Sequence, residues 1–141
     1  MINFLIALMA VIAFDVYGAR FVASGYDDFV LDKFGRFDFE SYTPKDGTVV
    51  EFDFDKGELS IDGSVKYTDI EPDRHWTRTD HDKYCLFYAI SSDNLDKVAV
   101  KVIYMDNGDK YVMLAGTKRA RRYKVRKRKA LTPNKKTENI R

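Results

Sequence analysis

Several residue types that define whole classes of protein are scarce in this chain of 141 residues. The single cysteine, Cys85, excludes an internal disulfide framework. It stands in an apolar run, which favours a small buried side chain over a reactive thiol. No Asn-x-Ser/Thr sequence is present, so we do not expect N-glycosylation.

The motifs that carry much of enzyme chemistry are missing as well. The sequence contains no glycine loop that would cradle a phosphate, no nucleophile elbow and no zinc-protease helix motif. We therefore expect a protein without enzymatic activity and without a cofactor.

Histidine is also rare, and both histidines, His75 and His81, fall in the polar stretch 71–82. Together with Asp80 they are of residue types that bind zinc. Their spacing matches no established ligand pattern, so a solvated loop explains this stretch better than a metal site. A small metal-dependent enzyme that uses the His75/His81 loop is the third of three functional hypotheses.

The most prominent feature that is present is the apolar start, since residues 2–14 carry no charge. As a helix they would extend for about 20 Å, which is short of the ~30 Å hydrocarbon core of a bilayer. A helix that spans would have to continue to about Ala23 and would bring Asp15 into or near the bilayer. The insertion free energies of the apolar residues and of one central Asp nearly cancel, so a spanning helix is marginal.

Three interpretations of residues 1–23 stay open. The first is a membrane anchor or a helix buried in a larger assembly. The second is a signal peptide that is cleaved after residue 18 or residue 24. The third is a helix in the core of a soluble domain. Under the first interpretation the side chains that we expect to make the membrane or assembly contact are Phe4, Leu5, Leu8, Val11 and Ile12.

Residues 24–117 form the predicted body. From residue 36 onward apolar and polar residues alternate, which is the period of half-buried antiparallel strands. Turn sequences at 43–47, 55–58 and 106–109 separate the strands. The apolar run 84–90 predicts a central strand that is buried on both faces. We predict a mainly β fold, either a small antiparallel β-sandwich or a partly open barrel, with roughly six or seven strands.

One segment ahead of these strands has the period of a helix. Tyr26, Phe29, Val30 and Phe34 follow one another at i, i+3, i+4 and i+8. The sequence before them resembles a capping box, and Gly35 after them is a natural stop. We predict a short amphipathic helix over residues 25–34, in addition to the apolar helix at the N-terminus.

Charge divides the chain sharply. Residues 118–141 hold 12 of the 24 Lys and Arg and one acid, a net charge of +11, whereas residues 1–117 carry −9. We interpret residues 118–141 as a basic tail, although Arg122–Arg126 still alternates as a last strand would. The tail residues that we expect to bind an anionic partner are Lys118, Arg119, Arg121, Arg122, Lys124, Arg126, Lys127, Arg128 and Lys129.

The first hypothesis is a non-enzymatic binding or assembly subunit, associated with a membrane or docked in a larger particle. Its apolar start would dock, its body would contact other protein subunits, and its basic tail would bind nucleic acid or acidic lipid. We expect the body to hold the two ends apart and to stay folded when residues 118–141 are removed. The second hypothesis is a secreted β-domain whose signal peptide has been cleaved.

Overall fold

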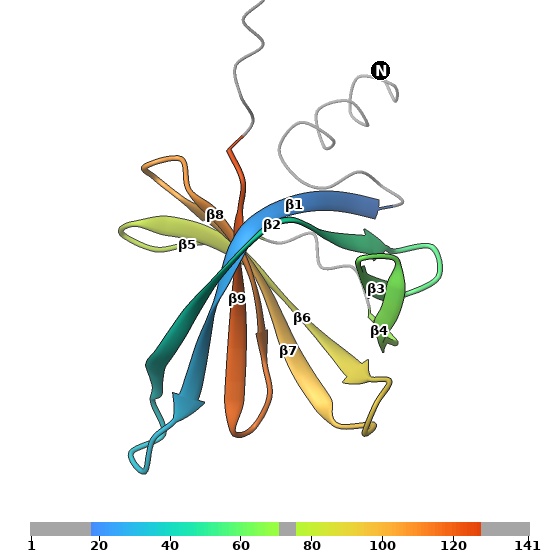
Figure 1. The fold of residues 1–141 in the computed structure, drawn as a ribbon, viewed down its shortest axis with the longest axis horizontal. Helices are drawn as coiled ribbons and strands as arrows, with labels where there is room; N and C mark the ends of the chain where they lie inside the picture. The colour runs from blue at the N-terminus through green and yellow to red at the C-terminus, as the bar shows by residue number, and fades with distance from the viewer. Residues whose placement is uncertain (1–17, 71–75, 128–141) are drawn as a thin grey trace, which may run out of the picture.

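The computed structural model describes residues 18–70 and 76–127, and these residues form strands, turns and loops without a helix. All of the strand pairings are antiparallel (Figure 1). The strands in chain order are β1 (Gly18–Leu31), β2 (Phe37–Asp53), β3 (Glu58–Ile61), β4 (Ser64–Thr68), β5 (Thr77–Arg78), β6 (Asp82–Ser91), β7 (Lys97–Met105), β8 (Lys110–Ala115) and β9 (Arg119–Val125).

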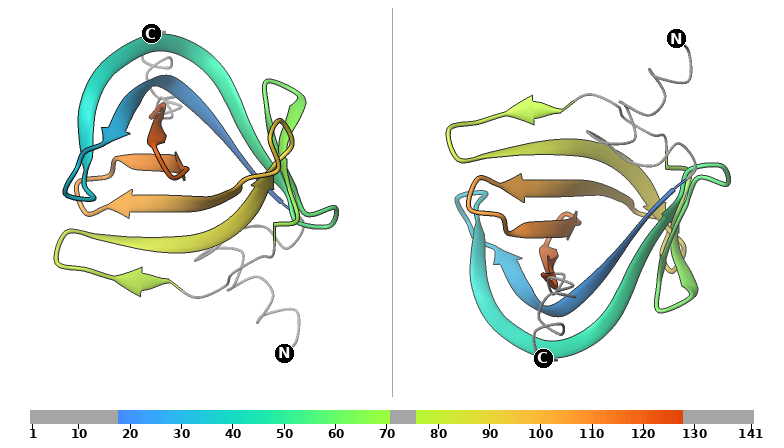
Figure 2. Two further views of the ribbon diagram at one scale, coloured as in Figure 1. Left: turned by 90° about the horizontal axis from the view of Figure 1, so that it is seen from below. Right: turned by 90° about the horizontal axis from the view of Figure 1, so that it is seen from above.

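Eight of these strands close into a barrel. Their order is β4-β3-β2-β1-β9-β8-β7-β6, and a further pairing between β4 and β6 joins the two edges. The short β5 stays outside the ring and pairs with β6 alone. Figure 2 views the strands along the barrel, where they surround a common interior. The predicted mainly β fold is confirmed, and the architecture is a closed barrel.

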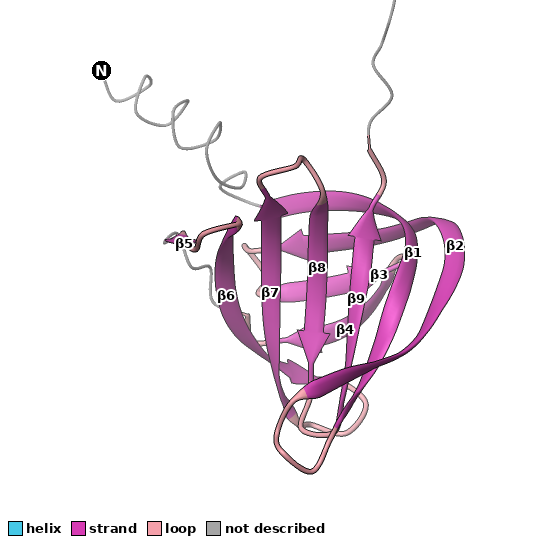
Figure 3. Cartoon of the chain, turned by 90° about the vertical axis from the view of Figure 1, so that its left-hand side faces the viewer, coloured by secondary structure: helices cyan, strands magenta, loops and turns pink. Residues whose placement is uncertain are grey.

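The long strands β1 and β2 bend as they pass around the barrel (Figure 3). The register of β1 shifts between Ala23 and Gly25 against both of its neighbours. A Cβ atom at Gly25 would collide with the hydroxyl of Tyr42 and would lie 2.7 Å from the carbonyl oxygen of Thr43. Glycine therefore allows β2 to approach β1 closely at this bend.

The interior of the barrel is packed with side chains. Phe52 is 1% exposed, and its ring lies 6.1 Å from that of Phe21, 5.5 Å from that of Phe54 and 5.8 Å from that of Phe87. Each fully buried apolar side chain of this size contributes about 1.5–3 kcal/mol to the free energy of folding. Cys85 is also buried in this core, as predicted. The other large side chains that are fully buried in the described part of the chain are Leu59, Val50, Val100, Val102 and Val112.

The prediction that residues 84–90 are buried on both faces is wrong. Within β6, Phe87 points into the core, while Leu86 is 36% exposed and Tyr88 is 53% exposed. The reason is that a barrel of antiparallel strands has one face towards the core and one towards solvent. The apolar side chains on the outer face of β6 therefore need another explanation.

The predicted helix over residues 25–34 is also wrong, because β1 continues to Leu31 and a hairpin turn follows. Tyr26 and Val30 are four residues apart, a spacing that shares a face on a strand as well as on a helix. Gly35 adopts a φ of 84° in the hairpin turn and ends no helix. The predicted N-terminal helix fails for residues 18–23, which begin β1, and its remaining part lies outside the described residues.

The predicted boundary at residue 118 falls inside the barrel. Strand β9 pairs with β8 on one side and with β1 on the other. Removal of residues 118–141 would take away a strand with two partners. The expectation that the body stays folded without residues 118–141 is therefore withdrawn, and we expect that this deletion unfolds the body.

Candidate anion-binding end of the barrel

Two arginines of the basic tract are held by carboxylates of the neighbouring strand. The guanidinium of Arg121 donates hydrogen bonds of 2.8 and 3.2 Å to the two carboxylate oxygens of Asp28. Arg122 donates two hydrogen bonds, of 3.1 and 2.8 Å, to one carboxylate oxygen of Asp27. Such charge-assisted, two-point contacts fix the side chains in place. The first role of these two arginines is therefore to hold β9 against β1.

The surroundings of Arg121 explain its charge state. The hydrogen bond that Arg121 donates to Asp28 raises the pKa of Arg121, although partial burial opposes this. The guanidinium lies 3.9 Å from the ring centroid of Tyr26. Burial raises the pKa of Tyr123 above its ordinary value, and the nearby Arg121 opposes the rise. The arginine thus stays cationic and the phenol stays neutral at physiological pH.

Three further cations of the tract form ion pairs at the surface. Arg119 pairs with Glu40, Arg126 pairs with Asp46 at 3.2 Å, and Lys127 pairs with Asp109 at 3.3 Å. Exposed ion pairs of this kind contribute about 0–1 kcal/mol, so an anionic ligand can compete for these cations.

The remaining cations predicted to bind anions have no such partner or lie elsewhere. Lys118 and Lys124 form no ion pair with any residue of the described part of the chain. Lys118 is exposed in the turn between β8 and β9, and Lys124 is half-buried on β9. Arg128 and Lys129 lie outside the described residues.

A hollow of about 1160 Å³ lies at the end of the barrel where β9 finishes. Its walls come from the starts of β1 and β8 and the ends of β2, β7 and β9, with parts of β3 and of the turns beside them. Five cations and three carboxylates line it, namely Arg20, Lys56, Lys110, Arg126, Lys127, Glu51, Asp53 and Glu58.

The hollow exists because β1 extends past its partner β9. Residues 18–22 of β1 pair with β2, whereas pairing with β9 begins only at Ala23. Beyond that point the backbone N–H of Arg126 donates one hydrogen bond of 2.6 Å to the carbonyl oxygen of Val22. One wall of the hollow is thus a strand edge.

The two ends of the described barrel meet at this hollow. Gly18 and Lys127, the first and the last described residues, both line it. The start of β1 and the end of β9 lie at the top of the barrel in Figure 1. The barrel therefore does not separate Gly18 from Lys127, while the apolar start and the residues after Lys127 lie outside the described residues.

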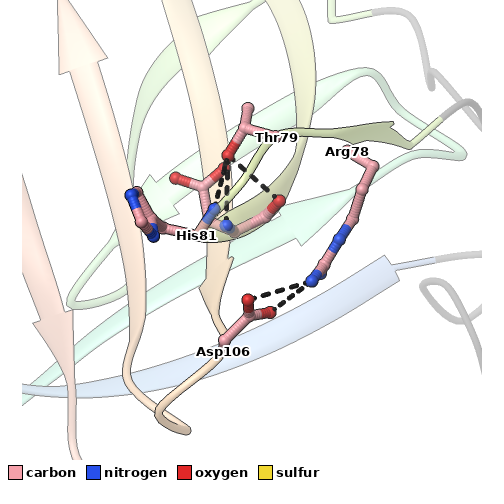
Figure 4. A network of polar contacts seen from close by, with 5 residues as sticks. Arg78, Thr79, His81 and Asp106 are labelled. Atoms are coloured by element: carbon pink, nitrogen blue, oxygen red, sulfur yellow. Dashed lines mark hydrogen bonds and ion pairs between the residues drawn. The ribbon is translucent and has the colours of Figure 1, made fainter.

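The described part of the polar stretch, residues 76–82, contains β5 and the turn that joins it to β6. The hydroxyl of Thr79 accepts hydrogen bonds from the backbone N–H groups of His81 and Asp82 and donates to the carboxylate of Asp82 (Figure 4). The imidazole of His81 points away from the ion pair between Arg78 and Asp106.

The described residues give the metal hypothesis no support. They contain no cluster of three or more His, Cys, Asp or Glu that could hold a metal ion. His81 and Asp80 are exposed in the turn, and His75 lies outside the described residues.

The predicted membrane or assembly contact also lies outside the described part of the chain, since all five of its residues precede Gly18. Residues 18–70 and 76–127 contain no helical segment with the length and apolarity that a membrane span requires.

Three of the cations at the hollow, Arg20, Lys56 and Lys110, were missed in the sequence, because they lie far apart along the chain and belong to no charge cluster. The partners of Arg121 and Arg122 left a signal, a pair of adjacent acids at 27–28 that matches the pair of adjacent arginines.

Comparison with known proteins adds no name to this geometry. No protein-family model, no curated protein and no solved structure matches the chain.

Proposed function

We propose that this chain is a non-enzymatic binding protein that attaches to an anionic membrane surface through one end of its barrel. The observation that carries the proposal is that Gly18 and Lys127 line the same hollow. The apolar residues before Gly18 and the basic residues after Lys127 therefore join the barrel at one end. An apolar segment next to a basic segment is the combination that stable attachment to anionic lipid requires.

Binding to the membrane through the apolar and the basic segment together is stronger than binding through the apolar segment alone. The apolar start alone is marginal as a membrane span. Residues 128–141 contain five Lys or Arg and one acid. Each basic side chain near an anionic surface contributes about 1 kcal/mol, so the segment supplies on the order of 4 kcal/mol at moderate salt. Arg20, Lys56 and Lys110 also line the hollow, but the carboxylates of Glu51, Asp53 and Glu58 offset their charge, so the segment after Lys127 supplies the attraction.

Sedimentation with lipid vesicles tests the proposal. We expect the full chain to sediment with vesicles that contain phosphatidylserine, and to bind vesicles of phosphatidylcholine alone at least tenfold more weakly. A variant that lacks residues 128–141 keeps all nine strands and should lose most of this preference. Raising the salt from 50 to 500 mM should have the same effect, because the Debye length shrinks.

Equal binding to both kinds of vesicle, or no binding to either, would contradict the proposal.

The alternative, a secreted β-domain, predicts that the mature chain has lost about 18 or 24 residues. Intact-mass measurement of the protein from its own cells distinguishes the two. Within the proposal, other protein subunits of a larger assembly would contact the remaining surface of the barrel.

A further inference from the structure

The outer face of strands β6 to β9 carries side chains that the core does not use. Since Cys85, Val102, Val112 and Tyr123 are buried side by side in the core, the residues next to them on each strand face outward. The register places Leu86, Lys101, Met113 and Arg122 in one row across the four strands. A parallel row contains Tyr84, Ile103, Tyr111 and Lys124.

This outer face, defined by the outward residues of β6–β9, carries more cations than acids. Strands β7, β8 and β9 contain no Asp or Glu, and β6 has only Asp82 at its start. The outward cations are Lys97, Lys101, Arg122 and Lys124. On the neighbouring strand β1, Asp27 lies opposite Arg122 and accepts a hydrogen bond from its guanidinium. The face therefore attracts anions and repels a second copy of itself.

Aromatic rings stand among these cations. The Nζ atom of Lys101 lies 4.2 Å from the ring centroid of Tyr84, and that of Lys97 lies 4.8 Å from the ring centroid of Tyr88. The guanidinium of Arg122 lies 4.5 Å from the ring of Tyr111. Each of these three rings thus has a cation over it.

The spacing of the rings limits the shape of the ligand. Tyr84 and Tyr88 are four residues apart on one strand, which is about 13 Å. Tyr84 and Tyr111 are two strands apart, which is about 10 Å. Neighbouring bases of a duplex stack at about 3.4 Å and lie inside it, so a duplex offers no base to rings with this spacing. A single strand whose bases are unstacked can place them on such rings.

We propose that the outer face of β6–β9 binds single-stranded nucleic acid, with phosphates on Lys97, Lys101 and Lys124 and bases on Tyr84, Tyr88 and Tyr111. The cations select a linear polyanion, and the rings between them select one that carries flat groups. This site lies on the side wall of the barrel and does not depend on attachment to lipid. The proposal stands or falls separately from the vesicle experiment.

Fluorescence anisotropy with a labelled twelve-residue oligothymidylate tests the site in the full chain. We expect Tyr88→Ala to weaken binding about tenfold, because it removes one stacking platform. Tyr88→Phe keeps the ring and should bind as the unchanged chain does. The double variant Lys97→Gln/Lys101→Gln should lower the slope of log affinity against log salt by about 1.4, since two phosphate contacts are lost.

Lys45→Gln is the matched control, because this lysine lies on β2, beside Asp62 and away from the outer face. It should leave oligonucleotide binding unchanged. Thermal unfolding of every variant shows whether the fold is kept; Tyr88 is 53% exposed, so its replacement should not alter the fold.

Three results would overturn the proposal. The first is that the full chain does not bind the oligonucleotide at 50 mM salt. The second is that Tyr88→Ala binds the oligonucleotide as tightly as the unchanged chain does. The same conclusion follows if this substitution weakens the binding of heparin and of the oligonucleotide equally, because the protein would then recognise charge alone. The third is that deletion of residues 128–141 abolishes binding while the double lysine variant retains it.

Discussion

At the scale of single residues, the ion pair between Arg121 and Asp28 stabilises the contact of β9 with β1. The side chain of Asp28 is 18% exposed and that of Arg121 is 43% exposed, so solvent screens the pair only in part. We expect Asp28→Asn to lower the free energy of unfolding by about 1–2 kcal/mol, because it leaves a half-buried guanidinium without its carboxylate. Chemical denaturation measures this change.

Asp46→Asn is the control for that measurement. Asp46 pairs with Arg126, and the two side chains are 64% and 49% exposed. Its loss should change stability by less than about 0.5 kcal/mol. Equal effects of the two substitutions would mean that the partly buried position of Arg121 does not strengthen its ion pair.

Tyr123 gives the protein a stability limit at alkaline pH. Burial raises its pKa above the ordinary value of about 10, so the folded protein holds this proton more tightly than the unfolded chain does. The resulting stability is fully present below pH 10 and is lost as the pH rises through the folded pKa. We expect the unfolding free energy to fall as the pH rises above about 10. In Tyr123→Phe this part of the fall should be absent, and an unchanged profile would contradict the assignment.

At the scale of elements, β9 decides whether the barrel closes. It pairs with β8 through Tyr111–Ala115 and with β1 through Ala23–Val30. We expect a chain that ends at residue 117 to lose cooperative unfolding, because both neighbours are left with open edges. A chain that ends at residue 127 should keep the cooperative transition. Circular dichroism during heating compares the two, and a folded 117-residue chain would show that β9 is dispensable.

The element that the sequence misrepresents most clearly is β1. Its apolar residues fit a helix by spacing, and its acids fit the polar face of that helix. In the barrel, Asp27 and Asp28 instead meet arginines that lie 95 and 93 residues further along the chain. Local periodicity contains no information about such partners, so tertiary pairing overrides it. The strands at 48–53 and 97–105 were predictable because their alternation has no competing period.

At the scale of the whole molecule, the proposed attachment fixes an orientation. Leu95 and Asn107 flank β7, whose nine residues span about 30 Å. Gly108, next to Asn107, lines the hollow, so this turn should face the lipid.

Labels at the two turns measure this orientation. A fluorophore attached through Asn107→Cys should be quenched by spin-labelled lipid on phosphatidylserine vesicles. One attached through Leu95→Cys should be quenched several-fold less. Both variants carry Cys85→Ala so that the label has one site. Stronger quenching at position 95 would show that the opposite end faces the bilayer.

The sequence by itself determined the β character of the body, the buried cysteine and the separation of charge. Each of these follows from composition or from the period of two, which are local properties of the chain. Only the tertiary structure decided that the basic tract begins in a strand of the barrel, that its arginines pair with the acids of β1, and that Gly18 and Lys127 line one hollow. These features depend on pairings between residues about a hundred positions apart, and the closure of the ring alone selects those pairings.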